Sequence, residues 1–169
     1  MRANNKQGKP LAKAAVLASL IADMEHALAV MVQAARVAHT AAVHEEMKPE
    51  NDKDTRGIEA GYLARGQSAR AAEIERCLRE LRTMQLPSLS HDDAVVVGAL
   101  VCTQGADTPA QVFIAASGGG VKLNISGVDV QVVTPHSPLG EALLGKRAGD
   151  TVELLAGGKK RELEILSVS

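Results

Sequence analysis

Carboxylates gather at one place in a chain that is otherwise nearly neutral. Between His44 and Gly57 the sequence reads HEEMKPENDKDTRG, and five of its acids fall within ten residues. These acids are Glu45, Glu46, Glu50, Asp52 and Asp54. Carboxylate oxygens are the usual protein ligands of hard divalent cations. Because the formal net charge is only -1, an electrostatic function has to come from a local patch such as this acidic segment, residues 45–54.

Two simpler interpretations of the acidic segment follow from its residues alone. The first is a solvated helical turn, in which acids favour a helix amino terminus and lysines keep the segment soluble. The second is a calcium loop, because Glu50, Asp52 and Asp54 alternate as calcium ligands do. The calcium loop is the weaker interpretation, since Thr55 stands where the sharp-turn glycine belongs and no closing glutamate follows.

Two helices are predicted to hold the acidic segment between them. The first should span Leu11 to about Met47, where Pro49 disfavours further helix, and the second should run to about Leu86. Both repeat apolar residues in steps of three and four, which is typical of an antiparallel helical hairpin. The repeating residues are Leu17, Ile21, Met24, Leu28, Met31 and Ala35, and then Ala71, Ile74, Leu78 and Leu81. Fraying or bending is expected near Gly57, Gly61 and Gly66, because glycine disfavours helix interiors.

The second half of the chain changes to the two-residue period of β-strands. Apolar, β-branched runs are predicted as strands at 94–103, 110–116, 121–125, 128–134, 150–156 and 161–168. One short helix should begin with Ser137 as N-cap and Pro138 as its first residue, and should stop at Gly145. The predicted fold class is therefore α + (α+β). Its parts are a flexible tail at 1–10, a helical hairpin at 11–86, a linker at 87–93 and a mostly antiparallel sheet domain at 94–169.

Composition excludes several kinds of protein. Aromatic residues make up 1% of the chain, so an aromatic-lined pocket is not expected, and two cysteines are too few for a disulfide framework. The five histidines have no metal-site spacing. A basic leader before an apolar run suggests a secretory signal, but Asp23, Glu25 and His26 close that run early. We also expect no stretch close to the roughly 20 apolar residues that cross a bilayer, hence a cytoplasmic protein with no membrane partner.

The segment from Val132 to Leu154 carries a more specific motif. It reads VVTPHSPLGEALLGKRAGDTVEL, and the hairpin AGGKKRELEILSV follows. This half resembles the carboxyl-terminal domain of the Gre transcript-cleavage factors of bacterial RNA polymerase. In that family a Ser-Pro-apolar opening leads to a short helix, then to Leu-x-Gly-Lys and an acid before a strand. The matching residues are Ser137, Pro138, Leu139, Leu144, Gly145, Lys146 and Asp150, and Gly98 matches a glycine of the family's first strand.

The resemblance extends to the helices, because the other half of Gre factors is an antiparallel coiled coil. It implies an FKBP-like domain that docks on RNA polymerase, with Ser137, Pro138 and Leu139 in the contact. The helical arm would enter the secondary channel and bring its acidic tip towards the catalytic magnesium of the polymerase. It also implies a protein without a cofactor or small-molecule substrate of its own, which stimulates cleavage of the nascent RNA by the polymerase and is not itself an enzyme.

The resemblance also assigns roles to individual side chains. Magnesium takes only one or two protein carboxylates and shares its other positions with water and phosphate, so the tip could complete a site built by another protein. Glu50 matches the family and would hold that magnesium. Asp52 is the first candidate for the second carboxylate, with Glu46 or Asp54 as alternatives, and all four are candidate catalytic carboxylates. The basic side chains of the second helix would follow RNA or the channel wall, or else form a solvated face. The candidates for this contact are Arg56, Arg65 and Arg70.

Two further functions remain open. The family's tip reads Asp-x-x-Glu-Asn, but here Met47 precedes Glu50 and Asn51, so the first acid is absent. The alternative function is therefore a secondary-channel regulator that binds polymerase and modulates or inhibits transcription without cleavage. A third possibility is a prolyl isomerase, suggested by the FKBP-like fold. Phe113 is the only aromatic residue after Tyr62, so the sequence argues against the aromatic walls of such a pocket.

Overall fold

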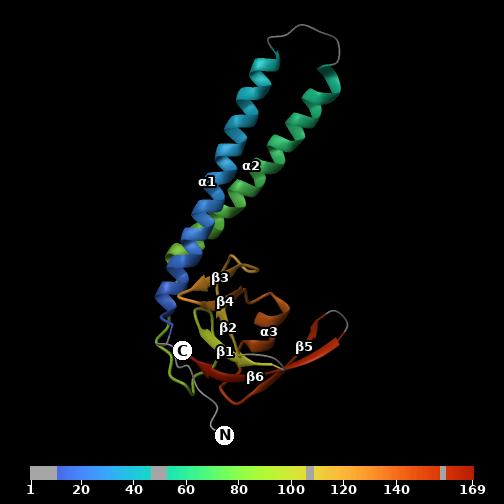
Figure 1. Ribbon diagram of the computed structural model, residues 1–169. Helices are drawn as coiled ribbons and strands as arrows, with labels where there is room; N and C mark the ends of the chain where they lie inside the picture. The colour runs from blue at the N-terminus through green and yellow to red at the C-terminus, as the bar shows by residue number, and fades with distance from the viewer. Residues whose placement is uncertain (1–10, 47–52, 106–108, 157–158) are drawn as a thin grey trace. The chain divides into compact units, whose positions relative to one another are not determined.

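Two long helices precede a six-stranded sheet and a short helix in this computed structural model (Figure 1). The structure describes residues 11–46, 53–105, 109–156 and 159–169, without the side chains of 38–39, 41–46, 53–65, 156 and 159. The helices are α1 (Lys13–Glu46), α2 (Lys53–Thr83) and α3 (Pro138–Leu143). The strands are β1 (Leu100–Gln104), β2 (Pro109–Ile114), β3 (Lys122–Ile125), β4 (Val128–Val133), β5 (Thr151–Ala156) and β6 (Lys159–Val168).

The chain divides into two compact units. The first contains the described residues up to Ile21 together with Glu80–Ser169, and the second is Ala22–Arg79. The ends of both long helices thus belong with the sheet, because Val16, Leu20 and Leu81 are fully buried there. The Lys13 ammonium also donates a hydrogen bond of 2.6 Å to the Pro87 carbonyl. Partial burial lowers the pKa of Lys13.

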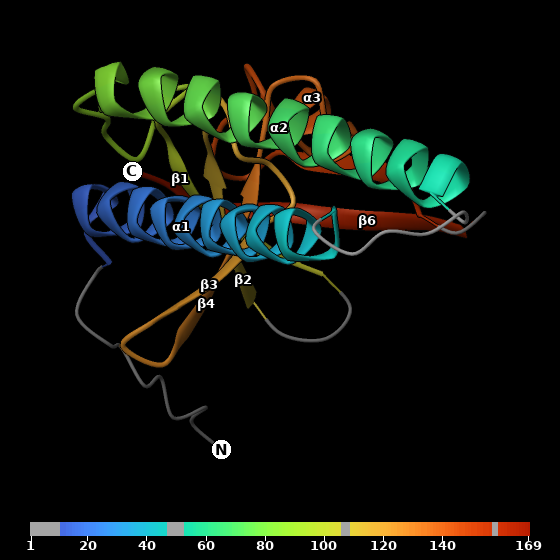
Figure 2. The same cartoon turned by 90° about the horizontal axis from the view of Figure 1, so that it is seen from above.

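The second unit contains the larger parts of α1 and α2, which lie side by side in opposite directions (Figures 1 and 2). Most of the residues expected along the seam are half-buried. They are Ile21, Met24, Leu28, Met31, Ala71 and Ile74, and Ala35 is the exposed exception. The first helix ends at Glu46, as predicted, but the second ends three residues before the expected Leu86. It also continues through Gly57, Gly61 and Gly66, so the expected fraying is not observed. Coiled-coil packing of the pair stays a prediction.

One expectation about α1 is wrong. By length and composition alone, the 25 residues Lys13–Val37 are apolar enough to cross a membrane. The cause is the run of alanines and valines, which count as apolar even though most of this helix is exposed, as at Val30 and Val37. An ordinary surface helix has an apolar face towards the core and a polar face towards water, whereas α1 is apolar on most sides.

The sheet is mostly antiparallel, as predicted, in the order β3-β4-β2-β1-β6-β5. The parallel pair β2–β4 places Phe113 beside Val132, and Leu100 lies on the other side of Phe113. These three residues are buried on one sheet face. The opposite face forms an aliphatic core with Val112, Ile114 and α3 (Figure 1).

The first strand differs from its prediction at Gly98. Its φ of 91° is left-handed, and the Ala99 N–H bonds back to the Val96 carbonyl, so β1 begins only at Leu100. A side chain at Gly98 would also collide with the linker, because its Cβ would lie 2.6 Å from Cδ of Pro87. Gly98 is therefore the point where the linker crosses the sheet domain, and it is not a residue of the first strand.

Gly98→Ala should destabilise the sheet domain more than left-handed backbone strain alone would. We expect the free energy of unfolding to fall by about 3 kcal/mol, from left-handed strain plus overpacking. Gly149→Ala is the matched control, because its φ is 88° and nothing lies within 4 Å of its Cβ position; it should cost about 1 kcal/mol. Urea unfolding followed by the ring protons of Phe113, the only phenylalanine, measures both. Equal losses would contradict the linker contact.

Candidate functional site

The acidic segment lies between the end of one long helix and the start of the next. Glu46 is the last residue of α1 and Asp54 is the second residue of α2, but their side chains are not described. Glu50 and Asp52 lie outside the described residues. The helix bounds therefore agree with a connection between α1 and α2 at the predicted place, while the roles of these four carboxylates stay predictions.

The basic residues assigned to the channel all lie on α2. The side chain of Arg70 is exposed to solvent, and those of Arg56 and Arg65 are not described. In the described part of the chain, no three His, Cys, Asp or Glu side chains lie where they could hold a metal ion.

The predicted docking residues form one turn at the start of α3. Ser137 is the N-cap, and its hydroxyl accepts a hydrogen bond of 3.1 Å from the Gly140 N–H. The same hydroxyl donates at 2.8 Å to the Thr134 carbonyl, which also accepts at 3.0 Å from the Ser137 N–H. Pro138 is exposed in the first turn, and Leu139 packs against the aliphatic core. The structure therefore brings Ser137, Pro138 and Leu139 together and confirms the cap and the first-turn proline.

Gly140 is a determinant of this turn that sequence reasoning missed. A Cβ at Gly140 would lie well inside contact distance of the Thr134 carbonyl oxygen and 2.9 Å from its carbonyl carbon. Only glycine lets the helix approach the end of β4 so closely. The available signal was a glycine inside a six-residue helix, a position where glycine costs about 1 kcal/mol unless packing requires it.

Gly140→Ala should push the docking turn away from the end of β4 and destabilise the sheet domain. We expect a loss of about 3 kcal/mol in the free energy of unfolding, because the added methyl group meets backbone atoms that cannot rotate away. Ala142→Gly is the control on the same helix, and it should cost only about 1 kcal/mol through helix propensity. Urea midpoints from the Phe113 ring signal test both variants. A Gly140→Ala loss no larger than that of the control would disprove the close approach.

A second polar cluster fixes the linker against the loop after α3. The Asp93 carboxylate accepts hydrogen bonds from the Ser90 N–H at 2.7 Å and the Ser90 hydroxyl at 2.8 Å. These bonds, with a smaller attraction from Arg147, hold the pKa of Asp93 below its ordinary value of 3.8. Arg147 in turn donates to the Asp92 carbonyl at 2.5 Å. Val95 exchanges two further backbone bonds with this loop, one with Gly145 and one with Lys146.

The Asp93 cluster predicts a pH dependence of stability. Because the pKa is lower in the folded chain, ionised Asp93 stabilises the fold above the unfolded pKa, and this stabilisation is lost as the pH falls through the folded value. Asp93→Asn should therefore be less stable than the parent at pH 6, and the difference should shrink below about pH 4. Urea midpoints at both pH values measure it, with exposed Asp129→Asn as the control. A difference independent of pH would exclude the charge as the cause.

The isomerase hypothesis loses its one aromatic candidate. Phe113 is fully buried and forms part of the sheet packing, so it lines no open pocket. The thiol of Cys102 is also half-buried, and burial raises its pKa, which keeps it protonated and unreactive at neutral pH. Neither residue offers catalytic chemistry in the sheet domain.

Comparisons with known proteins find a family match in the last part of the chain. Residues 124–169 match the family model of the carboxyl-terminal domain of the transcription elongation factors GreA and GreB. A GreA from Psychromonas ingrahamii is 25% identical over 99 residues, which cover 59% of this chain. The chain thus spans about 60% of the length of that curated relative.

Solved structures are similar at lower identity. The GreA factor homolog 1 (Gfh1) of Thermus thermophilus is 21% identical, with 88% of this chain and 94% of that chain covered and a TM-score of 0.37. A GreA/GreB factor from Nitrosomonas europaea is 19% identical, with 57% and 78% covered and a TM-score of 0.36. The motif around Ser137 lies within residues 124–169, which match the family model, so the predicted resemblance is confirmed.

Proposed function

Since this chain is a Gre-like factor, we propose that it binds bacterial RNA polymerase through the secondary channel and stimulates cleavage of nascent RNA in backtracked complexes. The observation that carries the proposal is the family match at residues 124–169, which contains the docking turn. The protein acts in the cytoplasm as an accessory factor. It has no cofactor or small-molecule substrate of its own, and the nuclease activity belongs to the polymerase.

The chemistry that we propose for the acidic segment is carboxylate ligation in trans. A magnesium ion in the polymerase active site supplies Lewis acidity and an activated water when it is bound. Glu50 and Asp52 would hold that ion, because magnesium accepts one or two carboxylates and keeps water and phosphate in its other positions. Glu46 and Asp54 would add negative charge beside them and orient the water that attacks the phosphodiester.

The docking turn supports the proposal through its rigidity and exposure. Two hydrogen bonds to the Thr134 carbonyl and one from Gly140 fix Ser137, so Pro138 is held at the surface with little conformational freedom. A preorganised surface loses less entropy when it binds. Arg70 is exposed on α2 and, with Arg56 and Arg65, would contact RNA phosphates or the channel wall.

A second candidate function keeps polymerase binding and omits cleavage. Met47 stands where the Gre tip motif has its first acid, and Pro49 interrupts the same stretch. With one carboxylate fewer, the segment would occupy the channel without holding the second magnesium. The protein would then modulate or inhibit transcription.

A cleavage assay on backtracked elongation complexes separates the two functions. With magnesium and this protein, we expect short 3′ RNA fragments to be released. Glu50→Ala and Asp52→Ala should each reduce the rate at least about tenfold, since even disturbing the surroundings of a metal ligand costs that much. Glu46→Ala and Asp54→Ala should have smaller effects.

Asp23→Ala is the matched control, because Asp23 is an exposed carboxylate of α1 far along the sequence from the acidic segment. It should leave the rate unchanged. Polymerase binding is measured in parallel by competition for the complex. Binding without released fragments would favour the inhibitory function, whereas no binding at all would refute both.

A further inference from the structure

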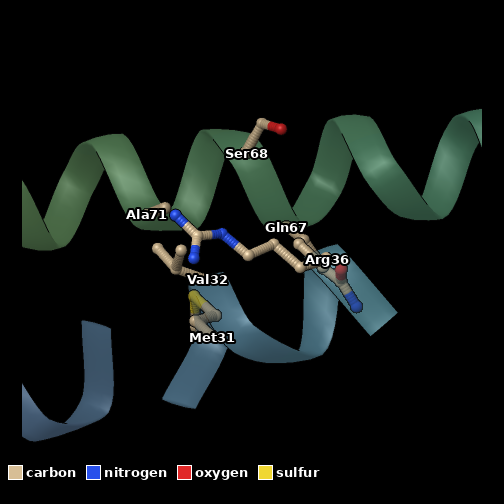
Figure 3. Close-up of a pocket in the computed structure, with 7 residues that line it drawn as sticks. Met31, Val32, Arg36, Gln67, Ser68 and Ala71 are labelled. Atoms are coloured by element: carbon tan, nitrogen blue, oxygen red, sulfur yellow. The ribbon is translucent and has the colours of Figure 1, made fainter. Parts of the chain in front are cut away.

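The helical unit contains a groove between α1 and α2 that the proposed function does not use. It has a volume of about 340 Å³ and is lined by Met31, Val32, Ala35 and Arg36 of α1 and, among others, by Gln67 and Ala71 of α2. Figure 3 shows Met31, Val32 and Arg36 of α1 and Gln67 and Ala71 of α2 at this groove. All of them belong to the unit Ala22–Arg79.

The sequence explains why the two helices leave space here. The groove is lined on the α2 side by Ser68 and Ala71, whose side chains are short. Opposite them, Met31 and Val32 provide an apolar wall, and the thioether of Met31 adapts easily to an occupant. The groove is thus mostly apolar, although it is open to water.

Arg36 is the single cation of this apolar groove. Its side chain lies along the space between the helices, with the guanidinium beside Ala71 and Val32 (Figure 3). Within the described part of the chain, Arg36 has no ion pair, and only its backbone carbonyl is engaged, by Thr40. A guanidinium presents parallel N–H donors that match a carboxylate, and the exposed side chain of Arg36 is accessible to such a ligand from solvent.

We propose that the groove binds a small amphiphilic carboxylate, with its charged group on Arg36 and its aliphatic chain against Met31, Val32 and Ala71. The volume is at the lower end of ligand sites, which favours one medium-length chain over a nucleotide. The single positive charge of Arg36 also matches the single negative charge of a carboxylate. This binding activity is independent of polymerase and of the acidic segment.

The methionine methyl groups provide a local test with decanoate as the probe. The chain has five methionines, and in protein labelled with ¹³C at those methyls, monomeric decanoate should shift the signal of Met31. Met84 should not respond, because its sulfur accepts the Ala116 N–H in the sheet-containing unit. The Met31 signal is assigned by its loss in Met31→Leu. Decanol, which lacks the charge, should bind at least about tenfold more weakly.

Variants test the charge and the space separately. Arg36→Gln should weaken decanoate binding about tenfold, whereas Arg76→Gln, an exposed arginine of α2 outside the groove, should change nothing. Ala71→Leu should fill the groove and abolish the Met31 shift, while circular dichroism shows that the helices remain. Equal binding of decanol, equal shifts at Met84, or binding only to phosphatidylglycerol vesicles and not to monomeric decanoate would each overturn the proposal.

Discussion

Close packing of aliphatic side chains is the constraint on which this structure depends. The sheet domain buries Val, Leu, Ile and Ala residues almost exclusively, with Phe113 as its one large ring. Small side chains bury little area each, so the backbone segments must approach one another closely to exclude water. Glycine then becomes necessary where the approach is closest. Gly98 admits Pro87 of the linker, and Gly140 admits the Thr134 carbonyl.

That close approach also makes the docking turn rigid. The Thr134 carbonyl can accept two bonds from Ser137 only because α3 begins directly above the end of β4. Leu139 anchors the same turn in the core, so Pro138 is exposed on a support that cannot easily rotate. The surface proposed to bind polymerase is therefore positioned by packing and backbone bonds, with no ion pair required among its described residues.

Charge is distributed very differently between the two long helices. α1 is apolar around most of its circumference, whereas α2 carries most of the arginines and several glutamates. A helix that is apolar on most sides is usually covered. Here much of α1 is exposed, and a groove beside Arg36 hollows its apolar surface. This contrast gives the helical unit a ligand chemistry that the sheet domain lacks.

The sequence by itself determined the order of the elements and much of the docking turn. Alternating and three-to-four periodicities reflect local geometry, so the helices, five of the six strands, the cap at Ser137 and the stop at Gly145 were predictable. Only the tertiary structure decided where segments distant in the chain approach each other. It shortened the first strand at Gly98, required glycine at 140, and placed Arg36 beside Ala71. Each of these features depends on how one element packs against another, which no periodicity within a single element encodes. The acidic segment was predictable as a connection between helices, because the end of α1 and the start of α2 bracket it.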